Sequence, residues 1–281
     1  MKRAAIIIAV LSMGLWSFGQ DKKAGQNPPA GQAAAAAPQG KRPPQAKTQP
    51  EYADYKAAMA LTDPVALEKA ADDFATKYPE SELRVVLYKA AMQRYEQANN
   101  ADKATDMARK ALTYDPDDPQ ALIGVAEVLA ERTREADLDK DQKLDEAKKD
   151  ATRALETIDT DLPTAGVTAE QLSAYKGRLR SDAYAVLGTM AFNAKNWPEA
   201  ETDLRKSIDA DPQEPDAVAM FRMAVALDMQ SRYPEALKYA NQAVDLTKDH
   251  PTTGAGKAAR DELDRLNKLN SGTAPGQSAP K

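Results

Sequence analysis

The stretch Trp197-Pro198-Glu199-Ala200 decides the fold, because it recurs 36 residues later as Tyr233-Pro234-Glu235-Ala236. In both copies an aromatic residue and a proline precede a glutamate and an alanine, and an amphipathic helical pattern follows. Proline is well suited to the first position of a helix, where its missing N–H group costs no hydrogen bond. Self-similarity at a period of about 20–50 residues is typical of a solenoid, so the two stretches predict repeated helix pairs.

The sequence around the first stretch contains one complete repeat. Residues 184–212 read YAVLGTMAFNAKNWPEAETDLRKSIDADP, in which Leu187-Gly188 lies in the first helical half and Ala200, Leu204 and Ser207 lie in the second. Small residues at fixed places let two helix backbones approach closely, and large ones fill the space between neighbouring pairs. The pattern resembles the tetratricopeptide repeat (TPR), a helix-turn-helix unit of about 34 residues.

The resemblance extends over roughly residues 52–269. Residues 88–116 and 221–251 carry further copies, and a fourth copy is split by an insertion. From Ala104 of the preceding copy to the equivalent Ala147 of the split copy is 43 residues, which leaves about nine extra residues in the turn. The small residues of the second helices are Ala104, Ala108 and Ala111, then Ala147, Ala151 and Ala154, then Ala200 and Ser207, and then Ala236, Ala240 and Ala243.

The resemblance implies an all-α solenoid that winds as a right-handed superhelix and ends in a capping helix. The capping helix has its apolar residues on one stripe, formed by Ala259, Leu263, Leu266 and Leu269. Thr168 and Gln171 form a capping-box pattern that starts one unusually long helix. The expected helices span residues 51–61, 64–78, 81–98, 101–114, 118–134, 141–158, 168–195, 198–210, 214–230, 234–247 and 254–269.

The ends of the chain divide it further. Residues 1–19 predict a signal peptide, because Lys2-Arg3 is followed by an apolar run and by Ser17-Phe18-Gly19 as a cleavage site. We expect cleavage and export to the periplasm or beyond, with no stable membrane span left afterwards. An uncleaved N-terminal anchor is the alternative. Residues 20–50 predict a disordered linker rich in Ala, Pro and Gln, residues 51–270 the repeat domain, and residues 271–281 a disordered tail.

Charge and composition exclude several classes of function. Residues 51–270 carry 30 Lys and Arg against 42 Asp and Glu, so this domain is acidic and not suited to nucleic acid. The chain has no cysteine and one histidine, His250, which rules out thiol chemistry and His-rich metal sites. The run Asp137-x-Asp139-x-Asp141 begins like a calcium loop, but Gln142 and Lys148 stand where that loop needs Gly and Glu. We therefore expect no cofactor, no metal and no enzymatic activity.

The remaining functional surface is the concave groove that the resemblance implies, lined by the first helix of each pair. Some members of the resembled family clamp a peptide carboxylate with Lys and Asn. Lys89 fits the first of these places, and Gln93 stands where Asn is usual. Groove positions carried over from the resemblance also fall at Ile123, Ala185, Thr189, Phe221 and Val225. The predicted partner-binding residues are Lys89, Gln93, Glu127, Asn193 and Arg222.

The resemblance therefore implies a protein-interaction scaffold or adaptor in the bacterial cell envelope, which binds a protein or peptide segment in its groove. The alternative is a structural envelope component that assembles with its own copies and has no discrete peptide ligand. The sequence leaves the oligomeric state open between these two hypotheses.

Overall fold

The computed structural model describes residues 40–164, 166–252 and 254–270. The predicted signal peptide, most of the predicted linker and the predicted tail lie outside the described residues. The described chain forms eleven helices, α1 Gln49–Met59, α2 Pro64–Lys77, α3 Leu83–Gln97, α4 Ala101–Leu112, α5 Pro119–Arg132, α6 Lys140–Thr157, α7 Ala169–Asn193, α8 Trp197–Ala210, α9 Ala217–Asp228, α10 Tyr233–Leu246 and α11 Gly254–Asn270. The all-α fold is confirmed, with every helix bound within three residues of its expected place.

Local side-chain chemistry sets where the helices begin. The predicted capping box of α7 is present, since Thr168 Oγ1 accepts from the N–H of Gln171 and the Gln171 side chain accepts from the N–H of Thr168. In α5, Asp118 caps a helix whose first residue is proline. The largest error in the expected bounds is the start of α9. That helix begins three residues late because Asp216 Oδ1 accepts from the N–H of Val218 and so acts as the cap.

Three of the turns between paired helices share the same backbone conformation, with one residue in the left-handed region. Asn99, Lys195 and Ser231 have φ angles of 56°, 58° and 60°, and each lies two residues before the second helix of its pair. The N–H of the next residue then reaches back to the last turn of the first helix. These bonds join Asn100 to Tyr95, Asn196 to Ala191 and Arg232 to Leu227 over 2.8–3.0 Å. A residue in the left-handed conformation, followed by an N–H that bonds to a carbonyl five residues earlier, is a common C-cap of a helix. The repeat is therefore also present in the backbone conformation of these turns.

The small residues predicted for the second helices lie in the seams between helices. In α8, Ala200 and Ser207 are fully buried, and so are Ala236 and Ala240 in α10. The equivalent alanines of α4 and α6 are at most 3% exposed. At Gly188 of α7, a Cβ atom would stand 2.8 Å from Leu204 Cγ of α8, so glycine permits the close approach of this pair. The seams explain why alanine and glycine recur at these places.

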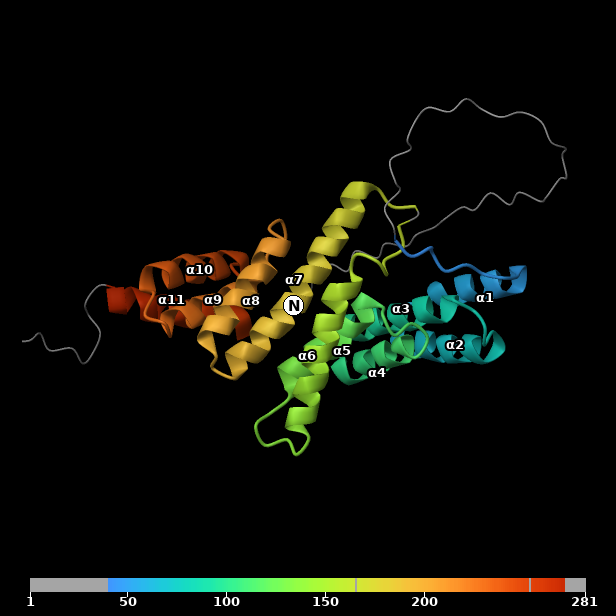
Figure 1. Cartoon of the computed structure of the whole chain (residues 1–281), viewed down its shortest axis with the longest axis horizontal. Helices are drawn as coiled ribbons and strands as arrows, with labels where there is room; N and C mark the ends of the chain where they lie inside the picture. Colours follow the sequence, from blue (N-terminus) through green and yellow to red (C-terminus); the bar gives the residue numbers. More distant parts are fainter. Residues whose placement is uncertain (1–39, 165, 253, 271–281) are drawn as a thin grey trace, which may run out of the picture.

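The helix pairs stack into an elongated molecule with α1–α4 at one end, α9–α11 at the other, and α7 running between the two halves (Figure 1). The core is divided accordingly into successive clusters, one that runs from α1 to α6 and reaches Val186 of α7, and one over α7–α11. A third cluster joins α5, α6 and the first half of α7 through Ile158, Leu162, Leu172 and Leu179. This third cluster accounts for the extra length of α7, whose first half packs on the insertion-bearing pair.

The last helix closes the stack as predicted for a cap. Ala259 and Leu266 of α11 are fully buried, whereas Leu263 and Leu269 are half-buried. Arg265 of α11 pairs with the carboxylates of Asp228 at the end of α9 and of Glu262 in its own helix. The charged remainder of α11 faces solvent, which is what the end of a solenoid requires.

Candidate partner-binding face

The predicted binding residues lie on the first helices α3, α5, α7 and α9. Hydrogen bonds of Lys89, Asn193 and Arg222 connect consecutive first helices, from α3 to α5, from α5 to α7 and from α7 to α9. We call the side of these helices that carries the predicted residues the first-helix face. It comprises Lys89, Gln93, Glu96, Glu127, Glu131, Arg178, Asp182, Asn193 and Arg222.

One end of the face holds an internal ion pair. Lys89 Nζ of α3 lies 2.6 Å from Asp118 Oδ2 at the start of α5, and the Asp118 side chain is only 5% exposed. Burial opposes the charge of the Lys89 ammonium, but Asp118 and the neighbouring Tyr175 outweigh it and raise the pKa of Lys89. Tyr175 of α7 donates from its hydroxyl to Gln120 Oε1 of α5 over 3.2 Å. Lys89 is therefore already engaged by its own fold, which leaves no free cation for a carboxylate clamp at this place.

The middle of the face is acidic. Glu96 at the end of α3 and Glu127 of α5 are both solvent-exposed, and Asp182 of α7 is half-buried. The surrounding protein removes water from the Glu96 carboxylate and so disfavours its charge. This effect, together with the negative charges of Glu127 and Asp182, raises the pKa of Glu96 to about 7. Arg178 of α7 opposes this rise only in part. Glu127 and Asp182, from two other first helices, thus lie close enough to destabilise the negative charge of Glu96.

The other end of the face is held together by two bridging side chains. Arg222 of α9 donates to Thr189 Oγ1 of α7 over 2.7 Å and to Glu131 of α5 over 2.8 Å, so one guanidinium joins three first helices. Asn193 at the end of α7 donates from Nδ2 to the carbonyl oxygen of Ala130 over 3.3 Å. Because both residues connect repeats, they contribute to the shape of the face as well as to its chemistry.

Some of the residues that the repeat pattern predicts to line the groove are therefore buried and do not lie on the surface. Ile123 and Thr189 are at most 5% exposed, and Ile123 belongs to the cluster beneath α7. Gln93, Ala185 and Val225 are half-buried. The residues that sequence reasoning missed are Glu96, Glu131, Arg178 and Asp182. Glu96 and Glu131 lie three and four residues after Gln93 and Glu127, so helical spacing alone places them on the same side of their helices.

The aspartates of the insertion between α5 and α6 are occupied by other groups of the chain. Lys143 Nζ lies 2.9 Å from Asp139 Oδ1 and 3.5 Å from Asp137 Oδ2. Asp137 also accepts from the N–H of Arg134, and this backbone bond is the main reason why the pKa of Asp137 is lowered. Over the ranges that the structure describes, no group of three or more His, Cys, Asp or Glu is arranged to hold a metal ion.

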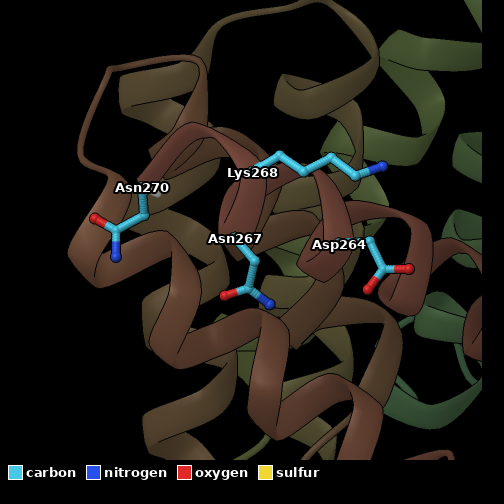
Figure 2. Close-up of a pocket in the computed structure, with 4 residues that line it drawn as sticks. All are labelled: Asp264, Asn267, Lys268 and Asn270. Carbon is cyan, nitrogen blue, oxygen red and sulfur yellow. The ribbon is translucent and has the colours of Figure 1, made fainter. Parts of the chain in front are cut away.

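Two depressions on the surface offer little to a ligand. The first lies over α11 and is lined by Asp264, Asn267, Lys268 and Asn270, which all come from this one helix and are all exposed (Figure 2). The second lies between the α4–α5 turn and α6, where Leu112, Pro116 and Leu122 are flanked by charged side chains of α6. One of these is Asp150, whose pKa rises to about 6 because of burial and the nearby Glu146.

Every helix within the described ranges is too short or too polar to cross a bilayer. No family model and no curated protein matches the chain. Among solved structures, the chain is similar to "MamA MSR-1 C2", with 18% identity over 69% of this chain and 100% of that chain, at a TM-score of 0.39. It is also similar to the "Assembly Chaperone of RpL4 (Acl4)", with 13% identity over 79% of this chain and 99% of that chain, at a TM-score of 0.41.

A third similar structure is PilW, a "type IV pilus biogenesis factor", with 15% identity over 76% of this chain and 99% of that chain, at a TM-score of 0.39. At such identities and scores, what these proteins assemble with says nothing about this chain. The helix pairs, the shared turns and the buried small residues of the chain itself are what identify its fold.

Proposed function

We propose that this tetratricopeptide-repeat-like chain is a protein-interaction scaffold of the bacterial cell envelope, which holds a cationic segment of a partner protein on its first-helix face. Stacked helix pairs form extended surfaces on which side chains from several repeats act together. The first-helix face is such a surface, because contacts join α3, α5, α7 and α9 along it. Repeat scaffolds bind with these surfaces and need no catalytic group.

The observation that carries the proposal is the acidic middle of the face. Glu96, Glu127 and Asp182 come from three different helices, and the negative charges of Glu127 and Asp182 add to the effect of burial in raising the pKa of Glu96. Lysine or arginine side chains of a bound segment would neutralise them, so binding and the acidity of Glu96 are coupled. The segment that fits is therefore extended or helical and carries spaced positive charges.

The envelope location rests on the N-terminal sequence. Lys2-Arg3, the apolar run after it and the small residues at Ser17 and Gly19 have the order of a secretory signal. The absence of cysteine from a chain that would work in an oxidising compartment means that its stability comes from helix stacking alone. Export followed by cleavage after Gly19 remains part of the proposal.

Site-specific photocrosslinking in living cells tests the position of the binding surface. A photoreactive amino acid replaces Gln93 on the first-helix face, and in the control it replaces Asp209, an exposed residue of α8. Because photocrosslinking requires contact, we expect a discrete adduct of fixed mass from the Gln93 position only. Equal adducts from both positions, or an adduct from Asp209 alone, would place the partner elsewhere. An adduct that is a second copy of this chain would favour the self-assembling alternative.

A further inference from the structure

The segment before α1 packs along the side of the solenoid and does not extend away from its α1 end. Residues 40–48 run from the loop between α6 and α7 along the first helix pairs to the start of α1 (Figure 1). We call residues 40–48 the strap. The composition of residues 20–50 predicts a disordered linker, but the strap makes fixed contacts at both of its ends and along its length. The residues that it contacts are not among those of the first-helix face.

The far end of the strap fits into the α6–α7 loop. Lys41 and Pro163 form an isolated parallel β-bridge. At Gly40, a Cβ atom would stand 2.1 Å from Thr164 Cγ2 and 2.8 Å from the carbonyl oxygen of Leu162. Contacts this short cannot be accommodated without moving the backbone of the loop, so the loop accepts only glycine at this position. The composition of the linker gives no sign of this fit.

Charged contacts join the strap to two further turns of the solenoid. Lys41 Nζ lies 2.6 Å from both carboxylate oxygens of Asp115 in the α4–α5 turn and 3.7 Å from Asp161 in the α6–α7 loop. The Arg42 guanidinium pairs with Glu82 at the start of α3, and the same carboxylate accepts from the N–H of Gln45 over 3.4 Å. One short segment therefore contacts three successive repeats.

The near end of the strap is anchored at α1. The N–H groups of Lys47 and Thr48 donate to Glu51 Oε2 over 2.7 Å and 3.2 Å, and Glu51 is only 2% exposed. Ala46 packs against the apolar cluster of the first pairs. Exposed ion pairs stabilise a protein little, so the strap depends on these packed and backbone contacts as much as on its charges.

We propose that the strap is a clamp that fixes the α6–α7 loop to the first repeats and makes the preceding chain emerge at the middle of the solenoid. A tether formed by residues before Gly40 would therefore hold the molecule at its α6–α7 loop, with both ends of the stack free. A solenoid tethered in this way presents its whole length to partners, whereas one tethered at α1 would extend away from its attachment point.

Disulfide trapping tests the position of the strap directly, because the natural chain has no cysteine. The paired substitutions Lys41→Cys and Pro163→Cys place two thiols at the β-bridge. We expect this pair to close a disulfide under mild oxidation in the full chain. The control pair Lys47→Cys and Pro163→Cys joins the opposite end of the strap to the same loop, and we expect it to stay reduced. Equal closure of both pairs, or closure of the control alone, would overturn the proposal.

Hydrogen exchange on a second variant tests the clamp without cysteines. Gly40→Val should displace the strap and increase deuterium uptake severalfold at residues 40–48 and 158–164, while α8–α11 keep the uptake of the parent. The matched control is Gly254→Val, because a Cβ atom at Gly254 meets no neighbour within 4 Å. An unchanged uptake of the strap and the α6–α7 loop in Gly40→Val would show that no clamp exists. Increased uptake over α8–α11 as well would show general unfolding, and would equally contradict a local clamp.

Discussion

At the scale of single residues, Lys89 and Glu96 of α3 have opposite effects on the contact between repeats. Lys89 is compensated by Asp118, a carboxylate that also accepts from the N–H of Ala121 and so caps α5. Glu96, two turns further along α3, faces the carboxylates of Glu127 and Asp182 instead. Lys89 thus stabilises the contact between two repeats, whereas Glu96 opposes it when it is ionised.

This difference between the residues could not be predicted from the sequence. The repeat pattern places Lys89 on the first-helix side correctly, but whether a lysine is free or paired depends on Asp118, which lies 29 residues away. The crowding of Glu96 likewise depends on Asp182, which the long α7 brings into range. Sequence spacing fixes the side of a helix, and tertiary packing then decides the state of each charge.

The pH dependence of a Glu96→Gln variant follows from its raised pKa. The pKa of Glu96 is about 7 in the folded protein and 4.5 for an ordinary glutamate, so the folded state binds this proton more tightly than the unfolded state does. The stabilisation by this carboxyl group is complete below pH 4.5 and is lost as the pH rises through 7. Glutamine carries no charge at any pH and avoids the loss.

We therefore expect Glu96→Gln to be more stable than the parent at pH 8, by up to about 1 kcal/mol after allowance for solvent screening. The gain should shrink towards zero at pH 4.5. Urea unfolding of both proteins at each pH measures the difference in free energy. Asp209→Asn on α8 is the matched control, since Asp209 is also an exposed carboxylate but lies on a second helix. A gain that is equal at both pH values would contradict the proposed crowding of Glu96.

At the scale of helices, regular spacing made most of the fold predictable. The small residues of α4, α6, α8 and α10 and the capping box of α7 are all found where the sequence places them. The exceptions have local causes. Asp216 caps α9, so this helix begins three residues later than expected. The strap is held in place by contacts with loops more than 70 residues away in the sequence. Such distant contacts leave no periodic pattern in the sequence.

Ala200→Leu tests the register of the α7–α8 pair. Ala200 is fully buried in the cluster that α7 and α8 share with the last helices. A leucine at this position overfills the seam, so we expect the free energy of unfolding to fall by about 1–3 kcal/mol. Chemical denaturation measures the change. Ala57→Leu in α1 is the control, because Ala57 is exposed and its enlargement should have little effect. A stable Ala200→Leu variant would mean that the assigned register of this pair is wrong.

At the scale of the whole molecule, the arrangement of charge links the fold to its proposed function. Residues 51–270 have an excess of acidic over basic residues, and some of the acidic groups, among them Asp118 and Asp139, form ion pairs within the chain. The middle of the first-helix face gathers three carboxylates from three helices near Arg178, whose Nε lies 3.9 Å from Asp182 Oδ2. The stacking of helix pairs is what brings them together, since no single repeat contains more than one of the three.

The central claim is that these three carboxylates hold the partner, and recovery of the photocrosslinked partner by a charge-neutralised variant tests it most directly. The variant combines Glu96→Gln, Glu127→Gln and Asp182→Asn. Its control combines Asp106→Asn, Asp209→Asn and Asp245→Asn, which remove the same charge from exposed positions on the second helices α4, α8 and α10. With both variants folded, we predict that partner recovery falls at least tenfold, or by about 1.4 kcal/mol, for the first variant and stays at the parent level for the control. Undiminished recovery by the first variant, or an equal fall for both, would contradict the account.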